Sequence, residues 1–267
     1  MDLQRIISGI IVVLGLLVIL LMPNTLVTAI LFAIIAIIAM NEYLGAISKV
    51  CNPIKWVTYL SCIIVVTINY IPQQYINLVL MGTVPTILLI LFAQVIATDM
   101  KTTFKDIAYT FLGICYIPGF MMFLSLINGM ENGKFLLIYA FIAAWGTDTF
   151  AYCIGKRLGK HKFSKVSPKK SIEGCVAGTV SAVILTLLYT LILNKNLSFE
   201  YSYCIIGISA LVLSLIGQIG DFAASCIKRY VDVKDYSNLL PGHGGMLDRI
   251  DSVLFIAPFA YILFTMI

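Results

Sequence analysis

The chain has 267 residues, of which 60% are hydrophobic and 12% are charged. A soluble domain averages about 25% charged residues, so this composition excludes a water-soluble fold that hides its apolar side chains in a core. The bilayer is the expected solvent, and the net charge of +5 is informative only through its distribution. The seven Cys are odd in number and lack a CxxC pair, which predicts reduced packing residues.

Nine apolar stretches are long enough to cross a bilayer as helices, the form that satisfies its own backbone in lipid. The predicted spans cover residues 5–22, 25–46, 56–72, 76–97, 106–128, 134–155, 174–193, 202–227 and 250–267. The first is longer than a signal-peptide apolar region and no A-x-A site follows it. Pro85 predicts a kink in the fourth. We therefore predict one all-α membrane domain over 1–267, with N-terminal helices (1–133) and a C-terminal catalytic part (134–267).

The distribution of Lys and Arg predicts the orientation of these spans. With nine spans and the N-terminus in the cytoplasm, every Lys and Arg except Lys134 and Lys195 falls on the cytoplasmic side. This asymmetry is the one that the positive-inside rule requires. Two loops on that side, 155–174 and 228–249, are polar and rich in Gly, Lys and Pro, and they contain both His residues. A water-soluble, polyanionic reagent is expected to bind there.

Carboxylates interrupt the C-terminal apolar stretches. Asp148 lies in the sixth predicted span and Asp221 in the eighth, while Asp248 and Asp251 share one face at the start of the ninth. An ionised carboxylate inside a span costs roughly 2.5–3.5 kcal/mol on insertion scales, so it faces a partner or a hydrated cavity. A single Asp in a span is as often a structural residue, paired with a Lys or Arg to fix helix packing, as a functional one. Mg²⁺ binds one or two carboxylates together with substrate phosphates. The four Asp residues together therefore favour a metal site at Asp221 and Asp248. For Asp251 three roles stay open: it orients the substrate, pairs with Arg249 or caps the ninth helix.

The loop before the ninth span suits contact with a phosphate. Gly244 and Gly245 follow His243 and allow backbone N–H groups to approach an anion closely. An ordinary flexible turn is the alternative. His243 is the better substrate contact of the two His residues, since His161 is expected to be a solvated loop residue.

Basic side chains accompany both loops. Lys169 and Lys170 precede the seventh span. Two roles are open for this pair: it clamps a triphosphate or a lipid phosphate, or it only anchors the helix among anionic head groups. Seven basic residues in that loop exceed what orientation requires, which favours the clamp. Lys228 and Arg229 end the eighth span, and the Arg guanidinium suits bidentate phosphate binding.

The signatures of several nucleotide-binding classes are absent, including the P-loop and the GxGxxG turn. Residues 225–229, 234–235 and 240–252 instead resemble the signature of the phosphatidate cytidylyltransferases, and the preceding Gly220 and Asp221 also fit. Upstream, the same family is resembled by residues 148–152, 155–156, 159–162 and 167–174. The resemblance covers residues 145–252. Phe222 stands where Leu is usual in that family, and residues 237–238 stand where a Gly-containing stretch is common. Neither departure removes a charged group.

The resemblance implies the reaction CTP + phosphatidate → CDP-diacylglycerol + diphosphate. It also implies a helical fold in the cell (inner or plasma) membrane, a homodimer, a site that faces the cytoplasm, Mg²⁺ on Asp221 and Asp248, and K⁺ as a second ion. Its partners are CTP, phosphatidate and membrane lipids, with no nucleic acid. The implied catalytic residues are Asp221, Asp248, Lys228, Arg229 and Asp251. The implied substrate-binding residues are Asp148, Lys169, Lys170, Ser171, Glu173, Ser225, Lys234, Asp235, His243, Gly244, Gly245 and Arg249.

Two other functions stay open from the residues. A CTP-dependent kinase of a lipid alcohol would need a base for its hydroxyl nucleophile and would release CDP. A cation-coupled transporter often shows polar interruptions in both halves of the chain, whereas here they are confined to the C-terminal half. The pattern of the CDP-alcohol phosphatidyltransferases is not found.

Overall fold

The structure is a computed structural model that describes residues 15, 25–164, 166–167, 170–197, 199–240, 242 and 244–266. Outside these residues lie Lys169, His243 and, except for Gly15, the first predicted span (5–22). Within the described part the chain is helical, and its β-type contacts are two isolated bridges, Lys162 with Ser171 and Leu240 with Gly244. The predicted all-α class is confirmed.

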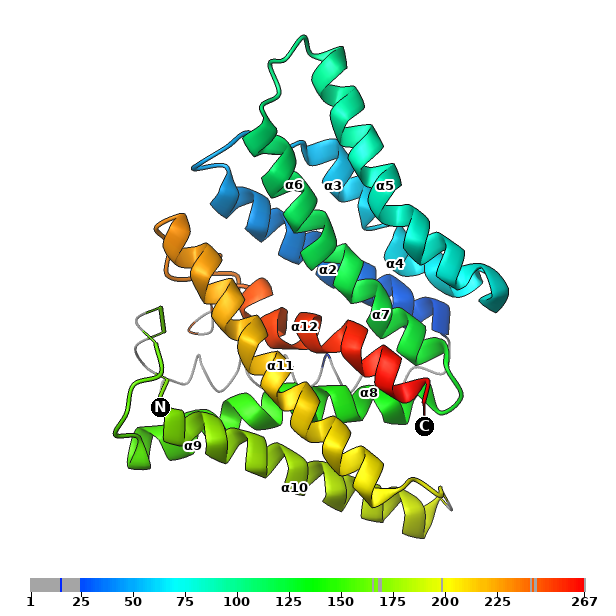
Figure 1. Cartoon of the computed structure of the whole chain (residues 1–267), viewed down its shortest axis with the longest axis vertical. Coiled ribbons are helices and arrows are strands. Elements are labelled where there is room, and N and C mark those ends of the chain that lie inside the picture. Colours follow the sequence, from blue (N-terminus) through cyan, green and yellow to red (C-terminus); the bar gives the residue numbers. More distant parts are fainter. Residues whose placement is uncertain are drawn as a thin grey trace. The chain divides into compact units, whose positions relative to one another are not determined.

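Figure 1 shows the helices in sequence colours. They are α2 (Thr25–Ile47), α3 (Lys55–Ser61), α4 (Ile64–Thr67), the 3₁₀ turn η1 (Ile68–Tyr70), α5 (Gln73–Ala97), α6 (Phe104–Tyr116), α7 (Pro118–Gly129), α8 (Gly133–Phe141), the π-helical turn η2 (Ile142–Gly146), α9 (Thr147–Leu158), α10 (Ile172–Asn196), α11 (Tyr203–Tyr230) and α12 (Leu247–Phe264).

Among the described residues, six helical stretches are long and apolar enough to cross a membrane. They are Thr25–Ile47, Gln73–Ala97, Phe104–Gly129, Gly133–Leu158, Ile172–Asn196 and Tyr203–Tyr230. Each coincides with a predicted span to within a few residues. The chain is therefore a multi-pass membrane protein by the length and apolarity of these helices.

The predicted helix over 56–72 is not continuous. The structure divides it into α3, α4 and η1, which together reach only from Lys55 to Tyr70. At the first break, the Ser61 hydroxyl donates to the Thr58 carbonyl at 2.7 Å. Such local bonds compete with the regular helix ladder. The ninth predicted span, 250–267, corresponds to α12, which begins three residues earlier than predicted, at Leu247.

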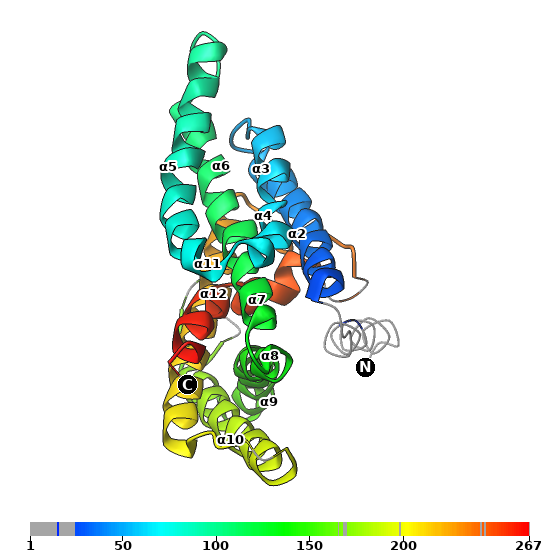
Figure 2. The ribbon, with the colours of Figure 1, turned by 90° about the vertical axis from the view of Figure 1, so that its right-hand side faces the viewer.

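Backbone contacts divide the chain into two compact units. The first unit runs to Gly129 and includes Val231–Arg249. In it α2 packs against α7 and α4, and α5 lies beside α6 (Figure 2). The Tyr43 ring fills the space that a Gly at position 113 leaves, because an added Cβ there would lie 2.5 Å from Tyr43 Cε1. The Tyr43 hydroxyl donates to the Tyr109 carbonyl at 2.9 Å, which fixes α2 against α6.

The second unit comprises Met130–Tyr230 and the chain from Ile250 onward. Here α10 packs along α9 and against α11. Two glycines of α10 permit this packing, because a Cβ on Gly174 or Gly178 would lie 2.6 Å from the Ala151 or Thr147 carbonyl oxygen of α9. Small residues let membrane helices approach backbone to backbone in this way.

The close approach of α9 and α10 predicts a stability effect. Gly178→Ala should lower the free energy of unfolding by about 1–3 kcal/mol, because the helices must separate to admit the methyl group. The matched control is Gly207→Ala, whose Cβ would make an ordinary 3.5 Å contact with Leu187. Thermal unfolding in detergent measures both variants. Equal melting temperatures for the two would contradict this account of the packing.

Candidate functional site

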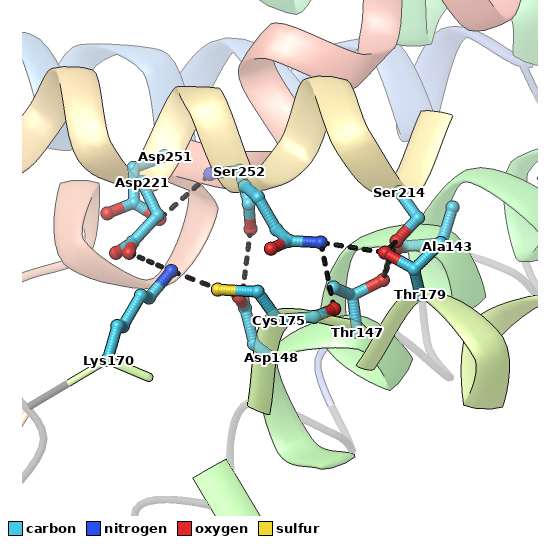
Figure 3. Close-up of polar contacts among 11 residues, drawn as sticks. Ala143, Thr147, Asp148, Lys170, Cys175, Thr179, Ser214, Asp221, Asp251 and Ser252 are labelled. Atoms are coloured by element: carbon cyan, nitrogen blue, oxygen red, sulfur yellow. Dashed lines mark hydrogen bonds and ion pairs between the residues drawn. The ribbon is translucent and has the colours of Figure 1, made fainter. Parts of the chain in front are cut away.

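In the second unit, Lys170 lies between two carboxylates (Figure 3). Its ammonium forms an ion pair with Asp221 of α11 and lies 3.9 Å from Oδ1 of Asp148 on α9. Three segments that are far apart in the sequence thus bring together three predicted site residues. All three side chains retain some solvent exposure, so the cluster is open to a ligand.

The charge of Lys170 is stabilised by its surroundings. Burial alone lowers the pKa of the ammonium, but the negative charges of Asp221 and Asp148 outweigh burial, so the pKa of Lys170 lies above its ordinary value. The ammonium also lies 4.9 Å from the centre of the Phe222 ring, which is within the range of a cation–π contact. Lys170 is therefore a fixed positive charge beside two carboxylates.

The first turns of α12 complete this cluster. The Ser252 hydroxyl donates to Asp148 Oδ2 at 3.0 Å, and the Ser252 backbone N–H donates to Asp251 Oδ1 at 2.8 Å. Asp251 is buried, with 3% of its surface exposed. The predicted orienting residue Asp251 thus lies in the same unit as Asp148 and Asp221, and Ser252 links it to Asp148. Ser252 was not predicted as a site residue, although it closes the motif that carries the resemblance.

A chain of polar side chains ties α9, α10 and α11 together next to the cluster (Figure 3). Thr147 and Ser214 hydroxyls lie 2.7 Å apart, Ser214 donates to Thr179 at 3.0 Å, and the Gln218 amide donates to Thr179 at 2.8 Å. Thr147 precedes Asp148. Gln218 lies three residues before Asp221, one turn along α11. These bonds therefore fix the rotation of α9 and α11, so that both carboxylates point toward Lys170.

The loop that carries Lys170 is held by its own side chains. Ser171 caps α10 by accepting a hydrogen bond from the Gly174 N–H at 3.1 Å. Glu173 lies 2.6 Å from Nδ1 of His161 and accepts the backbone N–H groups of Lys160 and His161. In this structure Ser171 and Glu173 serve the fold of the loop, and their binding to substrate stays a prediction.

In the first unit, Asp248 holds two backbone groups. Its Oδ2 accepts the N–H of Gly245 at 2.9 Å and the N–H of Tyr236 at 3.0 Å. Gly244 has a φ of +83° and pairs with Leu240 through two backbone hydrogen bonds. Asp248 and this backbone pair thus hold the described residues that lead into α12.

Glu42 is a buried carboxylate that the sequence analysis missed. One oxygen accepts the Ser237 hydroxyl at 2.6 Å and the Met246 N–H at 2.9 Å, and the other accepts the Leu247 N–H at 2.7 Å. A negative charge at the start of α12 is also favoured by the helix dipole. Glu42 thus anchors the turn that positions Asp248. The signal that points to it is an acidic residue inside an apolar span.

The remaining predicted residues lie at the ends of helices and in the second loop. Lys228 and Arg229 are in the last turn of α11, and Ser225 lies four residues after Asp221 on the same helix. Lys234 and Asp235 line a pocket of about 480 Å³ in the first unit, together with Lys49 at the end of α2. Arg249 follows Asp248 in the first turn of α12.

The donors suit a hard divalent cation, since Asp148 and Asp221 are carboxylates whose side chains remain partly exposed. Over the described ranges, no group of three or more His, Cys, Asp or Glu side chains forms a complete protein cage for a metal. A Mg²⁺ ion that shares its ligands with substrate phosphates does not require such a cage. The residues present are thus compatible with the ion that the resemblance implies.

Comparison with known proteins identifies the family of the chain. Residues 3–267 match the model of the cytidylyltransferase family. The chain is 38% identical to a phosphatidate cytidylyltransferase of Bacillus subtilis over 177 residues, which cover 66% of this chain and 64% of that protein. It is 35% identical to one of Staphylococcus aureus (strain COL) over 91% of this chain and 92% of that protein, and 31% identical to one of Staphylococcus haemolyticus over 97% of each. The chain belongs to the cytidylyltransferase family.

Proposed function

We propose that this protein is a phosphatidate cytidylyltransferase, which converts CTP and phosphatidate into CDP-diacylglycerol and diphosphate for phospholipid synthesis. The observation that carries the proposal is the match to enzymes of this name over nearly the whole chain. The cluster of Lys170, Asp148 and Asp221 agrees with it, because carboxylate oxygens suit a divalent cation that offsets the charge of two anionic substrates. Neither the lipid-alcohol kinase nor the transporter accounts for the family match.

The reaction needs little covalent chemistry from the protein. An anionic oxygen of the lipid phosphate attacks the α-phosphorus of CTP, the bond from that phosphorus to the bridging oxygen breaks, and its electron pair leaves with diphosphate. The nucleophile is already ionised at neutral pH, so no general base is required. Catalysis then consists of positioning two mutually repelling anions and stabilising charge on the leaving group.

Asp221 and Asp248 are the proposed ligands of Mg²⁺, with K⁺ as a second ion. When bound, Mg²⁺ neutralises phosphate charge and stabilises the departing diphosphate. Lys170 forms an ion pair with Asp221 and lies close to Asp148, so it positions both carboxylates. Lys228, Arg229, Lys234 and Arg249 supply further positive charge for the phosphates of CTP.

The proposed membrane arrangement has nine spans, with the N-terminus and the site on the cytoplasmic side. The support is the placement of all Lys and Arg except Lys134 and Lys195 on one side. CTP then enters from water while the acyl chains stay in the bilayer. A homodimer is proposed on the resemblance alone.

The proposed function predicts which lipid is the acceptor. The purified protein in detergent micelles should consume CTP in the presence of phosphatidate and Mg²⁺. It should not consume CTP when phosphatidate is replaced by diacylglycerol, which has the same chains but lacks the phosphate nucleophile. Chelation of the metal should abolish turnover, and added Mg²⁺ should restore it. Turnover with diacylglycerol would support the kinase instead.

A further inference from the structure

An apolar groove of about 780 Å³ runs between α10 and α11 of the second unit. Its walls include Ile172, Val176 and Val180 of α10 and Leu211, Leu215 and Ile219 of α11. Between 45% and 60% of each of these six residues is exposed, so their side chains are open to an occupant from the bilayer.

The polar side chains that border the groove are engaged with the protein itself. Gln218 donates to the Thr179 hydroxyl at 2.8 Å, and Thr179 also accepts the Ser214 hydroxyl at 3.0 Å. An occupant therefore meets mainly hydrocarbon along the walls. Such a surface suits a flexible apolar chain better than a nucleotide, whose base and ribose need polar partners.

The groove ends beside the charged cluster. Phe163 and Phe222 line this end and stack on each other, with ring centres 4.7 Å apart. The Lys170 ammonium lies 4.9 Å from the centre of the Phe222 ring and pairs with Asp221. A molecule that fills the groove thus has its polar end beside the charged side chains of Lys170 and Asp221, which fits a charged head group better than an apolar one.

The part of the groove between Leu211 and Phe222 is about as long as one leaflet of a bilayer is deep. From Leu211 to Phe222 the helix rises about 17 Å at 1.5 Å per residue. Half of the hydrocarbon thickness of a bilayer is about 15 Å. One acyl chain of a lipid in a single leaflet spans this depth, with its head group at the interface.

From these observations we infer that the groove between α10 and α11 binds one acyl chain of the phosphatidate substrate and delivers its phosphate to the Lys170–Asp221 pair. This inference rests on the proposed function. It implies that the groove between α10 and α11 contributes to the preference for acyl-chain length. The Phe163–Phe222 pair forms the boundary between the hydrocarbon and the charged part of the lipid.

The test compares two lipids that share the phosphatidate head group and have long or short acyl chains. Leu215→Trp and Val176→Trp place bulk in the groove and should raise KM for dioleoyl phosphatidate by about 10-fold or more. KM for dihexanoyl phosphatidate, whose chains are too short to fill the groove, should stay within about twofold. The matched controls are Ile208→Trp on α11 and Ile184→Trp on α10, which are similarly exposed but do not line the groove. They should change neither KM.

The smaller variants Leu215→Ala and Val176→Ala guard against misfolding by Trp. They should raise KM for the dioleoyl lipid alone, because they remove part of the wall. An equal response to both lipids, or no response, would overturn the inference. Failure of the wild-type protein to turn over either lipid with CTP would instead refute the proposed function, and the inference with it.

Discussion

Lys170→Met is expected to lower kcat/KM for CTP by about 100- to 1,000-fold, the usual effect of removing one preorganised charged donor from a site. The ammonium lies between Asp221 and Asp148 and contacts the Phe222 ring. Without it, the two carboxylates repel each other and lose the charge that holds them in place. Steady-state kinetics with phosphatidate in mixed micelles measures the effect.

The matched control for this prediction is Lys195→Met. Lys195 lies in the last turn of α10, which begins two residues after Lys170, and it is exposed. The substitution removes the same charge without touching the cluster, so kcat/KM should stay within about twofold of wild type. Both variants should melt as cooperatively as wild type. Wild-type kinetics for Lys170→Met would show that the cluster is only structural.

Glu42→Gln is expected to lower activity by about 10- to 100-fold, the range found when a group that orients metal ligands is removed. The carboxylate accepts three hydrogen bonds from Ser237, Met246 and Leu247. An amide NH₂ cannot accept, so the substitution leaves at least one N–H at the start of α12 without its partner. Because Asp248 follows Leu247 directly, the Mg²⁺ concentration needed for half-maximal activity should rise.

Two further variants separate positioning from general destabilisation. Glu131→Gln removes the same charge at an exposed position and should leave the Mg²⁺ dependence unchanged. Glu42→Asp keeps a carboxylate on a shorter stem and should recover part of the activity. If Glu42→Gln lowered the melting temperature but left the Mg²⁺ dependence of the folded protein unchanged, Glu42 would serve the fold alone.

Most of the helices follow from the apolar stretches of the sequence, because a bilayer requires a minimum length of helix. The helices α2, α5, α10 and α11 match the predicted spans closely. The stretch 56–72 is as apolar as a span, but Ser61 and Thr67 bond back to the main chain and the helix breaks. Composition alone does not register such local competition.

The sequence predicted which residues belong to the site, but it did not predict which of them contact one another. A carboxylate in a membrane span is costly, so Asp148 and Asp221 are conspicuous in the sequence. Lys170, in the loop before α10, lies close to both of them. This pairing depends on how α9 and α11 are rotated, which the hydrogen bonds among Thr147, Ser214, Thr179 and Gln218 set. Hydroxyl and amide side chains are common glue between membrane helices, so these four residues carry little signal of their own.

A sequence motif does not identify every residue that positions a site, and it does not give the role of each residue that it contains. Glu42 contacts residues about 200 positions away in the sequence, and no local pattern specifies that contact. Ser171 and Glu173 belong to the motif that carries the resemblance. In the structure they cap α10 and bind the loop backbone. A motif residue thus often maintains the geometry of a site without contacting a substrate.

The most direct test of the account is the fate of each phosphate of CTP. With phosphatidate in proteoliposomes, the label of [α-³²P]CTP should enter the lipid fraction, and the label of [γ-³²P]CTP should stay in water as diphosphate. This outcome is what attack of the lipid phosphate on the α-phosphorus requires. Transfer of the γ-label into lipid, with release of CDP, would contradict the account.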